Sequence, residues 1–183
     1  MIELILGGAR SGKSALAERR AAESWLAVNY IATGQGGDAE MARRIAHHRA
    51  RRPASWALVE EPLHLAATLT MHAAADRCLL VDCLTLWLSN LLYAGNAARQ
   101  AEAGEEVNCP LLAFETSALL DCLPHLPGRV IFVSNEVGLG VVPLGATTRL
   151  YVDDAGRLNQ AIARIAQRVS FVAAGLPLEL KGG

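Results

Sequence analysis

The chain has 183 residues, a formal net charge of −1, and 52% hydrophobic against 19% charged residues. This length predicts one domain over residues 1–183, and the small net charge argues against nucleic acid as a partner. The high apolar content predicts a sheet that is covered on both faces, a subunit interface, or both.

The first expected elements surround a phosphate-binding motif. Residues 7–14 read GGARSGKS, which fits G-x-x-x-x-G-K-[ST] at every fixed position. The apolar run from Ile2 to Leu6 predicts a buried strand before the motif, and Ser14 to Ser24 predicts a helix after it. Because strand, loop and helix follow in the order that a P-loop requires, we prefer a P-loop to an accidental glycine-rich turn.

The residue types of this loop suit a phosphate chain. The glycines let backbone N–H groups wrap the phosphates, and the helix N-terminus adds positive partial charge. We expect Lys13 to reach the β- and γ-phosphates and the Ser14 hydroxyl to bind Mg²⁺. The nucleotide-binding residues of the loop are then Gly7, Gly8, Ala9, Arg10, Ser11, Gly12, Lys13 and Ser14.

A second strand is expected from Val28 to Thr33, and a helix from Ala39 to Arg51 that Pro53 ends. Helical spacing puts two adjacent histidines on different faces of that helix. His47 lies on a charged face with Glu40, Arg44 and Arg51, and His48 lies on an apolar face with Met41 and Ile45.

A fourth buried strand carries an acidic residue at its end. Trp56 to Val59 predicts a strand and Leu63 to Ala75 a helix, whose two histidines are expected at the surface. The continuous apolar run from Cys78 to Val81 is typical of a fully buried parallel strand, and Asp82 follows it. Asp82 is therefore the candidate Walker B carboxylate.

The remaining elements continue the alternation of strands and helices. They are a core helix up to Ala94, an exposed connection from Gly95 to Asn108, a helix from Pro110 to Leu123, a strand from Val130 to Ser134, a last helix from Asp154 to Arg168, and a final strand from Ser170 to Ala174. This order predicts an α/β fold, in which helices flank both faces of a mostly parallel sheet.

Asn135 and Glu136 follow the strand from Val130 to Ser134. Ligands of open α/β sheets bind beyond the carboxyl ends of strands, so these residues either contact a ligand or cap the following loop. The sequence leaves both explanations open.

Four cysteines show no C-x-x-C pair and no regular metal-ligand spacing, which predicts free thiols rather than a zinc site. A signal peptide does not fit before a P-loop that begins at Gly7, so we expect a cytoplasmic protein. Polar residues interrupt the apolar stretch from Cys78 to Ala94, so we expect no membrane span.

A set of short motifs runs through nearly the whole chain, and only residues 95–108 carry none. The motifs are GGARSGKS, Tyr30 to Thr33, Glu40-Met41, Arg44-Ile45, His47-His48, Arg52-Pro53, Trp56, Asp82 to Thr85, Ser134 to Gly138, Val142-Pro143, Ala155 to Arg157, and Asn159-Gln160. Together they resemble one family, the bifunctional adenosylcobinamide kinase/adenosylcobinamide-phosphate guanylyltransferase of cobalamin biosynthesis.

The resemblance implies two reactions. The first phosphorylates adenosylcobinamide with ATP or GTP. The second transfers GMP from GTP to that phosphate through a guanylylated histidine, giving adenosyl-GDP-cobinamide and pyrophosphate. It also implies a RecA-like P-loop fold, a homotrimer, and Mg²⁺ as cofactor.

The resemblance also assigns residues to these reactions. It implies that His47 is the nucleophile, with His48 as the alternative if the match shifts by one residue. Ser14 and Asp82 would hold the metal. Further nucleotide contacts are implied for Ile31, Ala32, Thr33, His48, Arg49, Arg51, Glu60 and Asp82, and Glu61 is close enough in sequence to be confused with Glu60.

Two other classes of function also fit a P-loop. One is a plain kinase or NTPase that acts on another metabolite without a covalent intermediate. The other is a nucleotide-dependent interaction module without group transfer. Acid-labile, base-stable label from GTP on the protein would distinguish the bifunctional enzyme from both.

Overall fold

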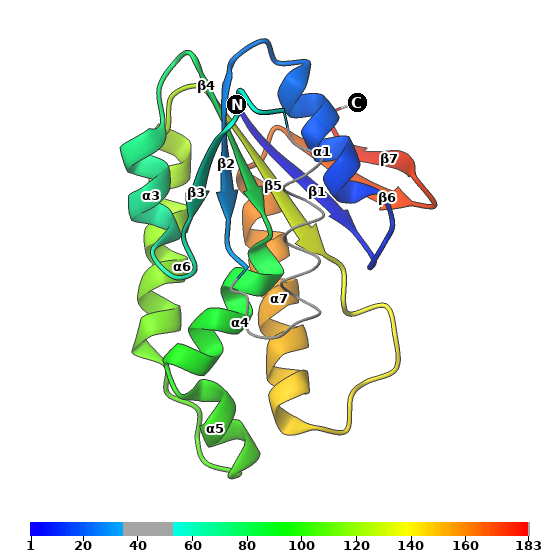
Figure 1. The fold of residues 1–183 in the computed structure, drawn as a ribbon. Coiled ribbons are helices and arrows are strands. Elements are labelled where there is room, and N and C mark those ends of the chain that lie inside the picture. Colours follow the sequence, from blue (N-terminus) through cyan, green and yellow to red (C-terminus); the bar gives the residue numbers. More distant parts are fainter. Residues whose placement is uncertain (35–52, 183) are drawn as a thin grey trace.

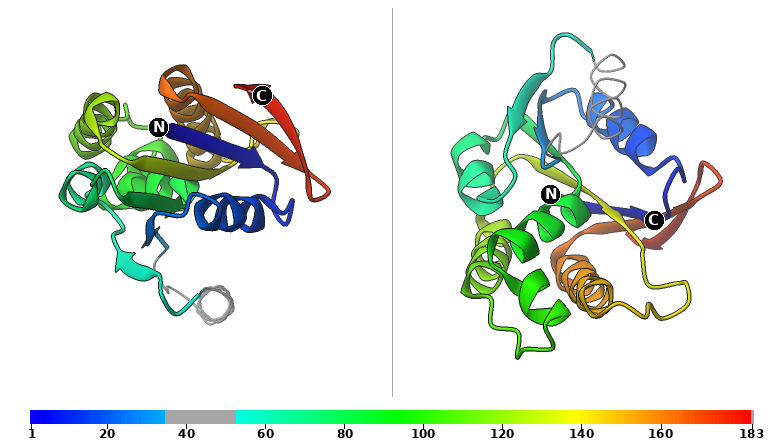
Figure 2. Two further views of the ribbon diagram at one scale, coloured as in Figure 1. Left: turned by 90° about the horizontal axis from the view of Figure 1, so that it is seen from above. Right: turned by 60° about the horizontal axis from the view of Figure 1, so that its bottom comes forward.

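The computed structural model describes residues 1–34 and 53–182 (Figure 1). Within these residues seven strands form one sheet in the order β3-β2-β4-β5-β1-β6-β7. Every neighbouring pair is parallel except the last, β6 with β7. The view from above shows helices on both faces of the sheet, so the predicted fold class is confirmed (Figure 2).

The strands are short and the helices vary in length. The strands are β1 (Ile2–Gly7), β2 (Ala27–Ala32), β3 (Ala57–Glu60), β4 (Arg77–Asp82), β5 (Arg129–Asn135), β6 (Arg168–Ala173) and β7 (Leu176–Lys181). The helices are α1 (Lys13–Ala22), α3 (Leu65–His72), α4 (Leu84–Ala94), α5 (Ala97–Glu102), α6 (Pro110–Cys122), the 3₁₀ turn η1 (Leu123–His125) and α7 (Ala146–Ile165).

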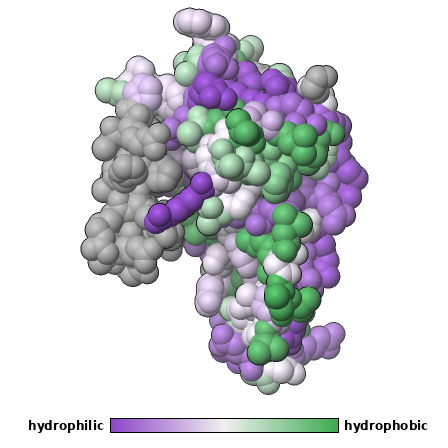
Figure 3. Space-filling model, turned by 90° about the vertical axis from the view of Figure 1, so that its right-hand side faces the viewer, coloured by the Kyte–Doolittle hydropathy of each residue, from purple (hydrophilic) through white to green (hydrophobic). Residues whose placement is uncertain are grey.

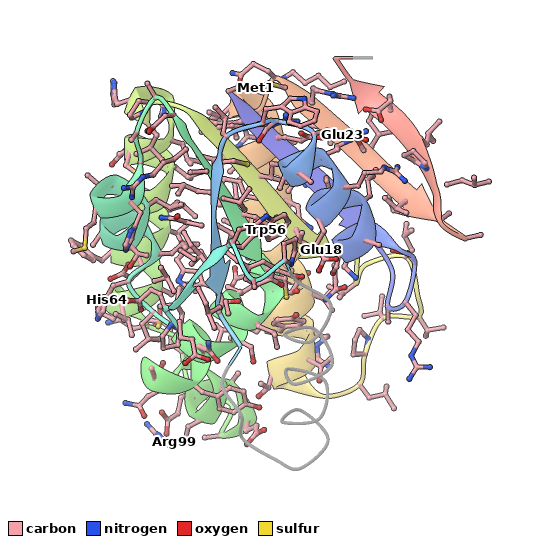
Figure 4. The ribbon with its side chains drawn as sticks, turned by 45° about the horizontal axis from the view of Figure 1, so that its top comes forward. Met1, Glu18, Glu23, Trp56, His64 and Arg99 are labelled. Carbon is pink, nitrogen blue, oxygen red and sulfur yellow. The ribbon has the colours of Figure 1, made fainter. Side chains whose placement is uncertain are left out.

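Alternate residues of the central strands supply two separate cores. In β1, Leu4 packs in the larger core together with α3, α4, α6 and α7, whereas Ile5 packs in the smaller core under α1. Both side chains are completely buried, as period-2 alternation in a two-faced sheet requires. Trp56, just before β3, packs against the smaller core near α1 (Figure 4).

The connection from Gly95 to Asn108 differs from its prediction. It contains α5, whose Ala97 and Ala98 are buried, and the Thr147 hydroxyl of α7 donates a hydrogen bond to the Ala98 carbonyl at 3.0 Å. The small alanine side chains allow the two helices to approach closely. Composition alone predicts a solvent-exposed linker here, because it does not reveal this packing.

The end of the chain also differs from its prediction. Helix α7 begins at Ala146 rather than Asp154, and β6 is not the final strand, because β7 follows it through a two-residue turn of Ala174 and Gly175. Both turn residues have positive φ, 51° and 80°, as a type I′ hairpin turn requires. The alternating leucines of β7 were the available signal for this strand.

Three other expectations concern the chain as a whole. All four cysteines are free thiols, as predicted. Among the described residues, no helix combines the length and the apolar character needed to cross a membrane. The helix expected from Ala39 to Arg51 lies outside the described residues.

Candidate functional site

The P-loop connects the end of β1 to the start of α1 at the carboxyl edge of the sheet (Figure 1). Gly12 and Arg10 have φ of 98° and 57°, and the Ser11 amide donates to the Gly8 carbonyl at 3.2 Å to close a turn. A Cβ on Gly7 would lie 2.5 Å from the Ser11 hydroxyl oxygen, so no larger residue fits there. The geometry of the loop therefore requires glycine at positions 7 and 12.

Lys13 is held inside this loop. Its Nζ donates to the Gly8 carbonyl at 3.1 Å, and the residue is only 9% exposed. Burial lowers the pKa of the Lys13 ammonium, and the negative charge of Asp82 raises that pKa in part. The lysine and the carboxylate thus lie close enough to interact, although 69 positions of sequence separate residues 13 and 82.

Asp82 ends β4 beside β2. The Tyr30 hydroxyl donates to Asp82 Oδ2 at 2.8 Å, and Tyr30 itself is 2% exposed. This contact orients the carboxylate from the neighbouring strand. Sequence reasoning named Tyr30 only within a motif; the available signal was a tyrosine in an apolar strand, whose buried hydroxyl needs a hydrogen-bond partner.

The donors at this site suit Mg²⁺. Ser14 at the start of α1 offers a hydroxyl oxygen, and the Asp82 carboxylate keeps acceptor capacity beyond its bond to Tyr30. Mg²⁺ prefers oxygen ligands and is usually held by one or two protein groups together with water and substrate phosphates. Two protein oxygens at a phosphate loop match this pattern.

The Ser11 hydroxyl is a buried polar atom without a hydrogen-bond partner in the described part of the chain. Such an atom costs free energy unless a ligand or water satisfies it. Its place in the loop fits a phosphate oxygen as the missing partner.

Not every residue assigned by resemblance has its side chain at this surface. Ile31 and Thr33 are both completely buried. The Thr33 hydroxyl donates to the Cys83 carbonyl at 2.7 Å and accepts from the Cys83 amide at 2.9 Å, so it fastens the end of β2 to the turn after β4. Ala32 is half-buried beside Asp82 in the parallel register.

The two glutamates after β3 have different environments. Glu60 ends β3 and is exposed. Glu61 Oε1 instead accepts the amides of Leu63 and His64 at 2.9 and 2.8 Å, and its Oε2 accepts the Thr68 hydroxyl at 3.3 Å. Glu61 thus binds the turn that leads into α3, at the outer side of the molecule where Figure 4 labels His64.

The polar residues after β5 also make internal bonds. Asn135 Nδ2 donates to the Thr85 hydroxyl at 2.9 Å, and Glu136 Oε1 accepts the Gly138 amide at 2.7 Å. The loop-capping explanation therefore holds for Glu136. Its side chain also borders a hollow of about 470 Å³ between α7 and the strands β1, β6 and β7, which Gln160 and Leu180 help to line.

Four of the candidate residues lie outside the described residues, namely His47, His48, Arg49 and Arg51. The structure brings together the P-loop and Asp82, and it leaves those four assignments as predictions.

The chain matches one family model over residues 3–180, described as cobinamide kinase / cobinamide phosphate guanyltransferase. It is 64% identical over 182 residues to the bifunctional adenosylcobalamin biosynthesis protein CobP of Pseudomonas aeruginosa, covering 100% of this chain and 98% of that protein. It is 38% identical over 182 residues to the bifunctional adenosylcobalamin biosynthesis protein CobU of Salmonella typhimurium, covering 99% of this chain and 100% of that protein.

Solved structures show likeness in fold. An ATPase from the type III secretion system of pathogenic bacteria superposes with a TM-score of 0.60 at 16% identity, over 97% of this chain and 56% of its own. The ATPase EscN of the enteropathogenic E. coli type III secretion system gives 0.53 at 15% identity, over 94% and 43%. At such identities the likeness establishes a RecA-like P-loop fold and nothing finer.

Proposed function

We propose a set of residues for the two reactions of this protein, on the premise that the chain belongs to the cobinamide kinase / cobinamide phosphate guanyltransferase family. The chain is a bifunctional enzyme of adenosylcobalamin biosynthesis, with kinase and guanylyltransferase activities. The family match over residues 3–180 supports this function and not a plain P-loop kinase or an interaction module.

In this proposal both reactions use the nucleotide site formed by the P-loop and Asp82. Backbone amides and Lys13 would bind the phosphates, and Ser14 and Asp82 would hold Mg²⁺, which would supply positive charge to the phosphate oxygens. In the kinase step the hydroxyl of the adenosylcobinamide aminopropanol group attacks the γ-phosphorus of ATP or GTP. The bond to the leaving nucleoside diphosphate breaks, and the hydroxyl proton is released.

His47 is the proposed nucleophile of the second reaction. A ring nitrogen of the neutral imidazole attacks the α-phosphorus of GTP, and pyrophosphate leaves with the electrons of the broken P–O bond. An oxygen of adenosylcobinamide phosphate then attacks the same phosphorus, the P–N bond breaks, and His47 is restored. Arg49 and Arg51 would bind the triphosphate, and the charges of neighbouring arginines disfavour a protonated imidazole.

One observation carries the proposal for His47. The segment that contains it follows Gly34, just beyond β2, and at this point the Thr33 amide donates to the Asp82 carbonyl at 3.3 Å. The segment therefore starts at the same edge of the sheet as the P-loop and the candidate Mg²⁺ carboxylate. This start supports a histidine of that segment as the group that reaches the nucleotide.

The experiment compares His47→Ala with His48→Ala, a matched control one residue away. Each protein is incubated with GTP labelled at the α-phosphate, and the acid-labile, base-stable label is measured together with the kinase rate. We expect His47→Ala to lose the label and keep the kinase rate, and His48→Ala to keep both. Label that persists in His47→Ala, or that maps to His48, would reverse the assignment.

A homotrimer is also proposed, supported by exposed apolar residues on one side of the molecule. They gather on β7 and on the loop before α7, where Figure 3 shows a hydrophobic face, and each is between 57% and 97% exposed: Leu139, Val141, Val142, Leu144, Leu176, Leu178 and Leu180. Light scattering should give three times the mass of the chain, and Leu178→Glu should lower it. A wild-type monomer would contradict the proposal.

A cytoplasmic location is also proposed for the enzyme. Its four cysteines, including the completely buried Cys78, are free thiols. Free thiols agree with a reducing compartment. Cell fractionation that recovered the protein outside the cytoplasm would refute this location.

A further inference from the structure

The tip of the β6–β7 hairpin touches the P-loop. The Gly175 amide donates to the Ser11 carbonyl at 2.8 Å, although the two residues stand near opposite ends of the sequence. A Cβ on Gly12 would lie 3.1 Å from the Cα of Gly175, so the two backbones are in close contact. Both glycines have positive φ, 98° and 80°, which side chains rarely adopt.

The strand before the tip supports the other end of the loop. Val172 pairs with Gly7 in the parallel register of β6 and β1, and its carbonyl oxygen would lie 2.6 Å from a Cβ on Gly7. The hairpin therefore borders the P-loop at Gly7, Ser11 and Gly12. None of these contacts uses a group that the proposed chemistry requires.

A buried ion-pair network fixes the hairpin to the helix that follows the loop. Arg20 of α1, which is 7% exposed, pairs with Glu179 of β7 and with the completely buried Glu3 of β1. Its Nη1 also donates to the Ser170 hydroxyl of β6 at 2.7 Å, and that hydroxyl donates to Glu179 at 2.9 Å. Such a network of charge-assisted bonds gives the hairpin one position relative to α1.

The base of the hairpin is fixed as well. Lys181 Nζ donates to the carbonyls of Ala163 and Arg164 at 3.0 and 3.1 Å, near the C-terminal end of α7. The hairpin is thus held at its base and middle, and its tip presents the Gly175 amide to the loop.

We infer that the β6–β7 hairpin positions the P-loop for nucleotide binding, with Gly175 as a positioning residue that acts through the backbone of Ser11 and Gly12. The hydrogen bond from the Gly175 amide fixes the orientation of the Ser11 carbonyl. The backbone of the loop is therefore ordered before the phosphates bind. Pre-ordering of this kind raises affinity because the ligand does not have to impose the loop conformation. The inference rests on the proposed GTP site in this loop.

The chain offers a matched control for Gly175. Gly104, after α5, also has positive φ, 70°, and at both glycines an added Cβ would meet nothing within 4 Å. Its amide closes a turn to the Ala101 carbonyl at 3.2 Å. A β-branched residue at either position strains the backbone in the same way, and only one of the two turns touches the P-loop.

The first experiment measures the Kd for GTP with Mg²⁺ and the melting temperature of three variants. We expect Gly175→Val to raise the Kd about tenfold, within the usual range for coupled sites. Gly104→Val should lower the melting temperature and leave the Kd unchanged. Gly175→Asn should restore a nearly normal Kd, because asparagine tolerates positive φ. A normal Kd in folded Gly175→Val would overturn the inference.

The second experiment uses the wild-type protein and so does not depend on the folding of a variant. Coupling is reciprocal, so GTP must stabilise the hairpin tip if the tip stabilises the loop. Hydrogen exchange of the Gly175 amide should slow when GTP and Mg²⁺ are added, while that of the Gly104 amide stays the same. Equal exchange of Gly175 with and without GTP would overturn the inference, and failure of the wild type to bind GTP would refute the proposed function as well.

Discussion

Two groups of polar residues at the same edge of the sheet differ in what they bind. In the P-loop, Ser11 has a buried hydroxyl with no hydrogen-bond partner among the described residues, and the Lys13 ammonium donates one hydrogen bond, to the Gly8 carbonyl. At the ends of β2 and β5, Thr33, Asn135 and Glu136 use their side chains for internal bonds. The first group keeps capacity for a ligand, and the second group holds the edge together.

The difference teaches that position at the carboxyl edge of a parallel sheet is not enough to identify a binding residue. What separates the two groups is hydrogen-bond capacity after folding. Four predictions test this separation and extend it to Asp82, as a ligand-binding residue, and to Glu61, as a residue with internal bonds. Variants of ligand-binding residues should change activity at constant stability, and variants of residues with internal bonds should change stability at constant affinity.

The largest effect is expected for Lys13→Ala. Loss of a positive donor that stabilises charge on the transferring phosphate should lower the turnover of both reactions about 10²- to 10³-fold. The control is Arg99→Ala, which removes an exposed positive side chain that pairs with Glu105. Steady-state kinetics of both variants check the prediction, and near-normal rates in folded Lys13→Ala would leave the loop without a catalytic role.

Asp82→Asn should act on the metal. The variant keeps the shape of the side chain and removes its charge, so the Mg²⁺ concentration for half-maximal rate should rise about 10- to 100-fold. The control is Asp76→Asn, an exposed aspartate just before the opposite end of β4. Unchanged Mg²⁺ titrations of Asp82→Asn would remove this carboxylate from the site.

Thr33→Val should lower stability and leave nucleotide affinity nearly unchanged. It leaves the Cys83 amide and carbonyl without their buried partner, so the free energy of unfolding should fall by about 1–3 kcal/mol. The Kd for GTP should stay within about twofold, a difference below 0.5 kcal/mol. Thr70→Val is the control, since the Thr70 hydroxyl bonds a carbonyl of its own helix at 2.9 Å. A large rise in Kd would instead make Thr33 a direct nucleotide contact.

The smallest effect is expected for Glu61→Gln, through pH. Burial alone would raise the pKa of Glu61, but the amides of Leu63 and His64 and the Thr68 hydroxyl outweigh it and hold that pKa below its ordinary value of 4.5. A lowered folded-state pKa stabilises the fold above pH 4.5, and this contribution is lost as the pH falls through the folded value.

Urea unfolding of wild type and Glu61→Gln between pH 7 and pH 3 measures this contribution. The difference between the two proteins should be about 0.5–1.5 kcal/mol at pH 7, the net size of a typical hydrogen bond, and should shrink in acid. Glu106→Gln, at an exposed glutamate, should not change the pH profile. A difference that grew toward acid pH would contradict the assignment.

The sequence predicted those parts of the site whose signal is local. The P-loop and Asp82 were identifiable because glycines, lysine and an acidic strand end occur next to apolar runs of the correct length. The places of six strands along the chain followed from the same apolar runs.

Other parts depend on partners that are distant in sequence. Whether Thr33 faces a ligand or Cys83 is decided by how β2 meets β4, and periodicity does not contain that information. Arg20 reads as one of several surface arginines of an amphipathic helix until β1 and β7 bring Glu3 and Glu179 to it. Strand β7 was missed because Pro177 interrupts a strand pattern and is tolerated only at a sheet edge.

The position of β1 has a consequence for how the chain is made. The strand that leads into the P-loop is synthesised before β5 and β6, but Ile2 pairs with Val130 and Glu3 with Arg168. Until those residues leave the ribosome, Leu4 and Ile5 have no strand beside them, although both are completely buried in the finished protein. The nucleotide site is therefore completed late in translation, and nascent chains that end before β5 should carry an exposed apolar strand and bind no GTP.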